Sequence, residues 1–508
     1  MASKTDFQPR QRLHPLSWLF SLTAFIRQLI IPLAAFLIFG ARDDNAAAWG
    51  AIVLVPLLIG ALWQQWIYRY GFGPRGLVIQ DGLFFRNVRQ IEYPRIENID
   101  IERGVLHRLL GVAQVSIATS TGGKAEASIR VLSLAAVQEM RERVFEKTHA
   151  SPRAEAAEAT EAPLLHLPAQ ELIRYGLIDN RGMIVVAAVG GLLYQAGSDE
   201  LIKRIADTWL HSSQLQEFTG LGIAMQIGLA IAGLLGILLS LRLFSIAFAL
   251  ITLFDFTLTR HKQDFRIRHG LLTRVALTLR IRRIQSVHQT ESLLHRLFDR
   301  VSLRADLVGD THSGQEGRQQ AQVRTRWLAP VCTKQQAWML IAAALPDIDL
   351  SHEPDWQPLA PRARMRLFRQ TLYFWTVLTL LITLTLHLVP ARAVSFSGNW
   401  MLLFLLAGVP LAWARSYIYV KHTRWALTPD AILFQHGWLT RELIVAPRNR
   451  VQSVMFSASP LDRRHEMAVV SVDTAGASAR DHIRIALLEK AVAQQLAAAL
   501  YRSTCGTA

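Results

Sequence analysis

Cysteine is nearly absent from this chain, which has only Cys332 and Cys505 in 508 residues. Two thiols so far apart give no support for a disulfide framework or for a cysteine-bound zinc ion. The sequence also lacks a P-loop, a dinucleotide-binding glycine motif and the G-x-S-x-G motif of many hydrolases. The signatures of the commonest nucleotide-dependent and nucleophilic enzymes are therefore missing.

Acidic residues are scarce as well, with 39 Asp and Glu against 55 Lys and Arg, which gives a net charge of +16. Despite this charge, 51% of the residues are hydrophobic. A soluble protein rarely combines these two features. We therefore expect apolar and basic residues to be segregated along the chain, as they are in membrane proteins.

Long apolar runs are what the chain has in abundance. Six are candidates for membrane spans, and the clear ones approach the roughly 20 residues that a helix needs to cross the hydrocarbon layer of a membrane, whereas the third is short. These candidate transmembrane helices are 18–40, 48–68, 183–197, a stretch within 219–256, 371–389 and 400–420. They form three pairs at 18–68, 178–256 and 371–420, followed by polar segments at 69–149, 257–346 and 421–503, with linkers at 150–177 and 347–370.

Basic residues are distributed unevenly around these spans. The short connections inside the pairs hold only Arg42, Lys203, Arg204 and Arg392, whereas the N-terminal tail and the polar segments hold nearly all the others. Cytosolic loops of membrane proteins carry the excess of Lys and Arg. The sequence therefore predicts a multi-pass protein with both termini and all three polar segments in the cytosol.

The three polar segments are copies of one another. In each copy a glycine is followed after thirteen residues by one arginine and after thirteen more by another. These three landmarks are Gly82, Gly270 and Gly437; Arg95, Arg283 and Arg450; and Arg108, Arg296 and Arg463. Two equal spacings kept three times without a gap indicate an internal repeat.

The pattern inside each copy is typical of β-structure. Two short apolar runs flank the landmark glycine, as in a hairpin, and alternating apolar residues continue through three further runs. Each copy ends in a stretch with helical periodicity, at about 134–147, 333–345 and 487–502. Each polar segment is therefore predicted to be a small β-barrel or sandwich capped by a C-terminal helix.

The sequence R-[IV]-Q-S-V at 283–287 and 450–454, followed by the leucine and arginine of the third landmark, resembles the bacterial pleckstrin-homology-like (PH-like) domain family. The first copy has Glu97 and Asn98 where the others have Gln and Ser. The whole layout is similar to the YdbT-like membrane proteins of bacteria. The resemblance implies three PH-like barrels in the cytosol under a bacterial inner membrane, without enzyme activity or cofactor. It also suggests a smaller membrane protein with one such domain as a partner.

Histidines near the second landmark invite a catalytic or metal-binding interpretation. His288 and His295 fall in different predicted elements, and the third copy has Met455 and Asp462 at these positions. Ser286, His288 and Glu291 share one short stretch, whereas catalytic triads are gathered from separate loops. Neither a metal site nor catalysis is favoured.

Six arginines of the second and third copies are candidates for binding a lipid or a partner: Arg280, Arg282, Arg283, Arg296, Arg450 and Arg463. One interpretation is structural, with each arginine at a strand end pairing with a carboxylate or capping carbonyl groups. The other is contact with anionic lipid headgroups, because a basic residue beside a negatively charged surface contributes about 1 kcal/mol. Nucleic acid is not favoured as a partner, since aromatic stacking platforms are missing.

Two further arginines, Arg27 and Arg242, lie inside predicted spans. A charge within the bilayer is costly, so each is a functional candidate. They leave open a transport or lipid-handling role, in which the six spans do the work. Because broken helices and other polar groups are sparse, we favour a scaffold that binds a membrane-protein partner or anionic lipid.

Overall fold

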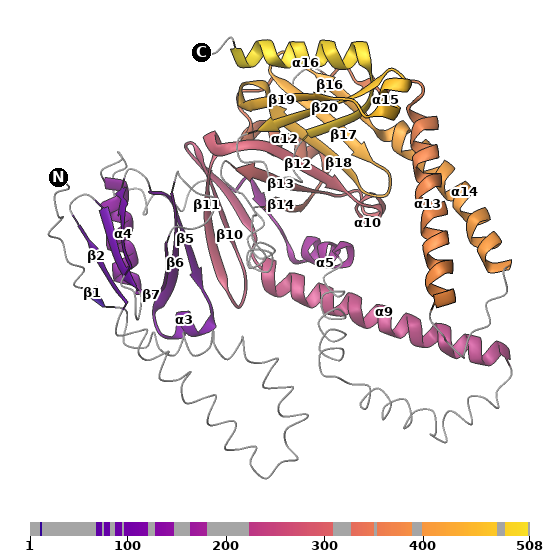
Figure 1. The fold of residues 1–508 in the computed structure, drawn as a ribbon. Helices are drawn as coiled ribbons and strands as arrows, with labels where there is room; N and C mark the ends of the chain where they lie inside the picture. The colour runs from indigo at the N-terminus through magenta and orange to yellow at the C-terminus, as the bar shows by residue number, and fades with distance from the viewer. Residues whose placement is uncertain are drawn as a thin grey trace. The chain divides into compact units, whose positions relative to one another are not determined.

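The computed structural model (Figure 1) describes residues 11–12, 68–73, 76–81, 87–93, 96–119, 127–146, 163–179, 223–307, 327–349, 353–388, 399–474 and 483–505. These residues divide into two compact units, Met1–Leu279 and Arg280–Ala508. The predicted spans 18–40 and 183–197 lie outside the described residues, as does 48–68 except for its last residue. Below, module 1, module 2 and module 3 denote residues 69–149, 257–346 and 421–503.

Two of the described helices are long and apolar enough to cross a membrane. The qualifying stretches are Ile227–Leu253 of α9 (Ile223–Leu253) and Ala363–Leu384 of α13 (Ala363–Leu388). α13 lies side by side with α14 (Asn399–His422) in Figure 1, and the Trp375 and Phe404 ring centroids are 5.1 Å apart. α13 and α14 correspond to the third predicted pair, and α13 starts inside the predicted linker 347–370.

The first unit contains two antiparallel sheets. One has the order β1-β2-β3-β4 and the other β7-β6-β5-β11-β10-β9-β8. Their strands are β1 Gln11–Arg12, β2 Arg69–Phe72, β3 Gly76–Asp81, β4 Asn87–Glu92, β5 Ile96–Arg103, β6 Val112–Thr119, β7 Ala127–Ser133, β8 Leu165–His166, β9 Thr257–His261, β10 Asp264–His269 and β11 Arg274–Arg280. The second sheet therefore combines the last strands of module 1 with the first strands of module 2.

The second unit repeats this arrangement with the later modules. Its large sheet has the order β14-β13-β12-β18-β17-β16-β15, and a smaller one has the order β19-β20-β21. The strands are β12 Ile284–Glu291, β13 Val301–Leu307, β14 Trp327–Cys332, β15 Gln357–Pro358, β16 Arg424–Leu427, β17 Ala431–Gly437, β18 Arg441–Pro447, β19 Val451–Ser457, β20 Met467–Thr474 and β21 Ile483–Glu489. The last strands of module 2 and the first strands of module 3 again form one sheet.

Each module has a closing helix after its last strand: α4 (Leu134–Glu146), α12 (Lys334–Ala344) and α16 (Lys490–Cys505). In module 3 one apolar core unites Phe434 of the first strands, Val470 of the last strands and Leu496 of α16. Module 1 is built in the same way, with Ile79, Ile117 and Met140 of α4 in one core. The prediction of β-sheet domains is confirmed.

A short helix carries the third landmark arginine in every module. These helices are α3 (Val105–Leu109), α10 (Leu293–Leu297) and α15 (Pro460–Arg464). Ser292 caps α10 and Ser459 caps α15, each within a reciprocal capping box that satisfies otherwise unpaired N–H groups. The caps fix where the helix begins and therefore where its arginine lies.

Residues before each span pair add a strand to the module that follows the pair. The two-residue strands β1, β8 and β15 pair with β2, β9 and β16, so that Arg12 lies opposite Arg69, His166 opposite Thr257 and Pro358 opposite Arg424. The three pairings have the same register within the repeat. The predicted linker 150–177 thus holds β8 and most of α5 (Ala169–Ile178), and the predicted linker 347–370 holds β15.

Candidate functional site

Two strand pairs connect successive modules, and both have polar side chains in equivalent positions. Antiparallel pairs β5–β11 and β12–β18 form these two junctions. In the first, Arg274 lies opposite Arg103; in the second, Arg441 lies opposite Glu291. Arg274 and Arg441 each follow a landmark glycine by four residues, while Arg103 and Glu291 each follow a second-landmark arginine by eight. The two junctions therefore have one and the same register.

The third landmark arginine strengthens each junction. Nη1 of Arg108 donates to the backbone oxygen of Leu271 at 3.2 Å, and Nη2 of Arg296 donates to that of Leu439 at 2.5 Å. Both acceptors lie in the turn after the landmark glycine of the next module. The recurrence of this arginine is thus explained by a bond from one module to the hairpin of its successor, and the predicted site residue Arg296 lies at the second junction.

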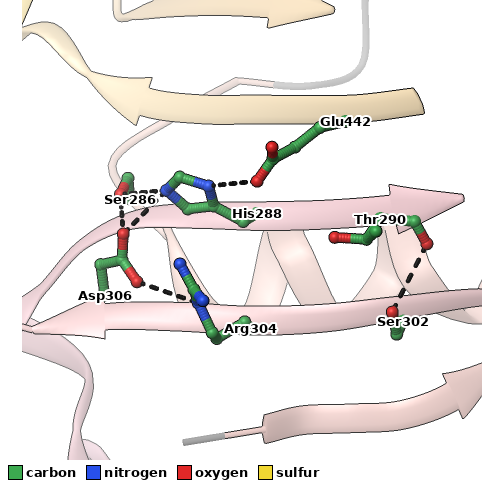
Figure 2. Close-up of polar contacts among 7 residues, drawn as sticks. All are labelled: Ser286, His288, Thr290, Ser302, Arg304, Asp306 and Glu442. Carbon is green, nitrogen blue, oxygen red and sulfur yellow. Dashed lines mark hydrogen bonds and ion pairs between the residues drawn. The ribbon is translucent and has the colours of Figure 1, made fainter. Parts of the chain in front are cut away.

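Inside the second junction a buried histidine joins three strands (Figure 2). His288 of β12 places Nε2 2.8 Å from Oδ2 of Asp306 in β13 and Nδ1 3.0 Å from Oε1 of Glu442 in β18. Its side chain is only 2% exposed. Arg304 pairs with the other carboxylate oxygen of Asp306 at 3.4 Å. One cation therefore connects an acid of its own module to an acid of the next.

The surroundings of His288 set the protonation state of the cluster. Burial by itself lowers the pKa of His288, but the hydrogen bonds and charges of Asp306 and Glu442 raise the pKa to about 9. Burial raises the pKa of each carboxyl group, but the surrounding hydrogen bonds and positive charges, with His288 the largest contributor and Arg304 a smaller one, together lower the pKa below its usual value. At neutral pH the site is an imidazolium held between two carboxylates.

A serine completes an arrangement that resembles a catalytic triad. Oγ of Ser286 lies 3.2 Å from Nε2 of His288, whose Nδ1 contacts Glu442. A general base needs a free lone pair on Nε2, but this atom is protonated and already paired with Asp306. The geometry fits a structural cross-link between modules. The sequence pattern pointed to Glu291 as the nearby acid, whereas the structure brings in Asp306 and Glu442 from other strands.

The cluster predicts a stability optimum near neutral pH for the second junction. His288 has a folded-state pKa of about 9 against an ordinary 6.5, so its contribution is complete below pH 6.5 and is lost as pH rises through about 9. This loss amounts to roughly 3 kcal/mol. Asp306 and Glu442 contribute stability at every pH above the ordinary pKa of a carboxyl group. This stability is lost as the pH falls through their lowered folded-state pKa values. Hydrogen exchange of the β12 and β18 amides, corrected for intrinsic rates, should be slowest between these limits; protection that is flat up to pH 10 would contradict the assignment.

The other predicted arginines occupy varied environments. Arg282 is exposed, while Arg280 and Arg283 are half-buried, all at the corner where β11 ends and a 3-10 turn, η4 (Ile281–Arg283), begins. Arg450 donates from Nη2 to Oδ2 of Asp347 at 2.8 Å. Arg463 is exposed, and the described residues offer its side chain no hydrogen bond or ion pair.

Arg242 lies within an apolar stretch of α9 but has backbone partners. Its Nη1 donates to the carbonyl oxygens of Leu177 at 3.0 Å and Asp179 at 3.3 Å, where α5 ends. Ser245 donates to the same Asp179 oxygen at 2.9 Å. The last carbonyl groups of a helix have no partner within it, so these two side chains cap α5. Arg27 lies outside the described residues.

The first junction borders a basic cavity of about 320 Å³. Three arginines line it, Arg103 of β5, Arg268 of β10 and Arg274 of β11, together with Asp255 just after α9. The Nε of Arg103 is buried and has no hydrogen-bond partner. Three guanidinium groups against one carboxylate make this cavity suited to an anion.

Comparisons with known proteins agree with this architecture. The family model described as Bacterial PH domain matches three stretches, 24–148, 207–329 and 377–504. The UPF0699 transmembrane protein YdbT of Bacillus subtilis (strain 168) is 23% identical over 502 residues, which cover 94% of each chain. No solved structure matches the chain significantly.

Proposed function

Because the chain belongs to the bacterial PH domain family, we propose that it is a non-catalytic membrane scaffold. Its three modules act as a cytosolic platform that binds a membrane-protein partner and anionic lipid headgroups. Six transmembrane helices in three pairs anchor this platform in the bacterial inner membrane, and each module closes into a PH-like barrel capped by its C-terminal helix. The partner fits the description of a smaller membrane protein with a single PH-like domain.

The observation that carries this proposal is the common register of the two junctions. Strands β5 and β11, and likewise β12 and β18, join modules edge to edge, and an arginine bond adds to each junction. Each junction holds two modules side by side, so that their binding surfaces lie at a set spacing, which is what a scaffold requires. The role of Arg242 as a helix cap supports a scaffold over a transporter, because its charge is used within the fold.

Two basic places support lipid binding. Arg280 and Arg282 have no acidic partner among the described residues, and the cavity beside the first junction exposes Arg268 and Arg274 close to the end of α9. The cavity is lined by Phe254 and Asp255, which directly follow α9, and α9 carries a candidate membrane span. A phospholipid phosphate accepts hydrogen bonds from paired guanidinium groups.

Purification of the tagged full-length chain from gently solubilised membranes tests the proposal. We expect a membrane protein to co-purify in a fixed ratio and anionic phospholipid to remain bound. The triple variant Arg280→Glu, Arg282→Glu, Arg283→Glu, or the double variant Arg268→Glu, Arg274→Glu, should retain less anionic phospholipid, as measured by extraction and mass spectrometry.

The matched controls replace the same arginines by lysine, which keeps the charge and should preserve lipid retention. Equal lipid retention by all variants would contradict the lipid-binding role. Recovery of the chain without any stoichiometric membrane protein would contradict the partner-binding role, whatever the lipid result.

A further inference from the structure

Two strand edges of the kind used in the junctions are left without a neighbouring module among the described residues. Within the described residues, β4 pairs with β3 alone and β19 pairs with β20 alone. By position in the repeat, β4 corresponds to β11 and β18, whereas β19 corresponds to β5 and β12. The described part of the chain therefore leaves one edge of each type unpaired, and the two types are complementary.

The side chains of β19 are exposed at positions that a neighbouring strand covers in β12. Met455 is 64% exposed, whereas His288, at the same position of β12, is 2% exposed because β18 lies beside it. Phe456 is also 39% exposed, and β19 has the sequence VQSVMFS, without a charged residue. Proteins often protect an exposed edge strand with charges or a proline, and β19 has neither. Its register shift between Val451 and Ser453 recurs in β5 and β12, which a neighbouring strand nevertheless covers. An uncharged edge with exposed apolar side chains is typical of a strand that another strand covers.

We propose that β19 of one chain pairs in antiparallel fashion with β4 of a second copy, in the register of the two junctions. In that register the residue six positions after the landmark glycine lies opposite the one six positions after the second-landmark arginine, as Ala276 lies opposite Ile101 and Leu443 opposite Gln289. Applied to the free edges, the rule places Val88 opposite Phe456.

The predicted neighbours fit one another chemically. Val88 is 62% exposed, so pairing removes two exposed apolar side chains, Val88 and Phe456, from water at once. This match comes from the chain's own two edges and favours a second copy as the occupant.

Arg463 provides an independent observation. It is the third landmark of module 3, and its counterparts Arg108 and Arg296 both donate to the hairpin turn of the next module. Arg463 is exposed, and the described residues give its side chain no hydrogen bond or ion pair. In the proposed pairing it contacts module 1 of the second copy, as its two counterparts contact the module that follows them.

The pairing is head-to-tail, so it joins copies into rings or rows. Copies in one membrane share the same orientation, which allows the edge-to-edge contact of the junctions to form between chains. The inference goes beyond the scaffold function and does not depend on the identity of any partner.

Cysteine cross-linking between differently tagged full-length chains tests the pairing. One chain carries Val88→Cys and the other Phe456→Cys, both in a Cys505→Ser background, and membranes from cells making both are treated with a mild oxidant. Opposed residues of paired strands lie within the distance that a disulfide spans. We expect a product of twice the chain mass that carries both tags and disappears on reduction.

Controls establish the register and the role of the arginine. Arg89→Cys should cross-link poorly with Phe456→Cys, because a shift of one residue turns the side chain to the other face. Arg463→Ala should weaken association about tenfold and reduce the yield accordingly, whereas Lys490→Ala, another exposed cation of module 3, should not.

Either of two results would overturn the proposal. One is the absence of the two-tag product when both variants reach the membrane at normal levels and keep the protease resistance of the parent chain. The other is that a single chain with both cysteines yields only an internal cross-link. Failure here leaves partner recovery unaffected, so it is distinguishable from failure of the scaffold function.

Discussion

Replacing His288 by leucine is expected to destabilise the second junction by about 3–5 kcal/mol. The reason is that Asp306 and Glu442 lose their shared cation while they remain partly buried, at 17% and 34% exposure. The expected loss exceeds that of an ordinary surface ion pair, which contributes at most about 1 kcal/mol. Hydrogen–deuterium exchange of the full-length chain at pH 7 measures the effect as faster exchange of the β12 and β18 amides.

A combined variant separates lost pairing from lost packing. Adding Asp306→Leu and Glu442→Met to His288→Leu removes the unpaired carboxylates, and most of the protection should return, because an apolar replacement of a whole buried ion cluster is often neutral. The β5 and β11 amides of the first junction serve as the internal reference and should not change. If His288→Leu alone left β12 and β18 fully protected, the cross-link between modules would not be a source of stability.

The sequence was sufficient to predict the modules but not their connection. Spacing of the landmark glycines and arginines identified the three copies. Part of this pattern has a local cause, because Gly270 and Gly437 shape hairpin turns and Ser292 and Ser459 cap the short helices that carry the third arginine. The junctions depend on which strand edges meet, and no local pattern encodes that choice. His288 and Glu442 are 154 residues apart, so a search for nearby acids could only find Glu291.

The hydrogen-bond acceptors of the arginines could not be predicted from the sequence either. Recurrence at a fixed spacing marked Arg108, Arg296 and Arg463 as equivalent. The acceptors of Arg108 and Arg296 are backbone oxygens, which leave no trace in the sequence. Arg242 was singled out because a charge in an apolar run is unusual. Its acceptors at the end of α5 are again backbone oxygens, more than 60 residues away in the chain.

Gly437→Ala is expected to destabilise the hairpin β17–β18 by about 3 kcal/mol or more. Gly437 has φ +114°, a region that residues with a side chain rarely adopt, and an added Cβ would lie 1.9 Å from the backbone oxygen of Thr440. The turn must rearrange to accommodate it, and the same turn supplies the Leu439 oxygen to which Arg296 donates. Faster hydrogen exchange is therefore expected in β17 and β18 and, through the junction, in β12.

Two other glycines make this prediction specific. Gly270 has the same geometry in module 2, with φ +109° and a Cβ position 2.0 Å from the Thr273 oxygen. Gly270→Ala should therefore open β10, β11 and the first junction and leave β17–β18 protected. Gly233→Ala in α9 has open space around its Cβ and should be neutral or slightly stabilising.

If Gly437→Ala and Gly233→Ala gave the same exchange pattern, the left-handed turn would not determine the junction. If each hairpin variant opened its own junction alone, the two junctions would be separately stabilised contacts, each of which depends on the glycine that shapes the adjoining turn.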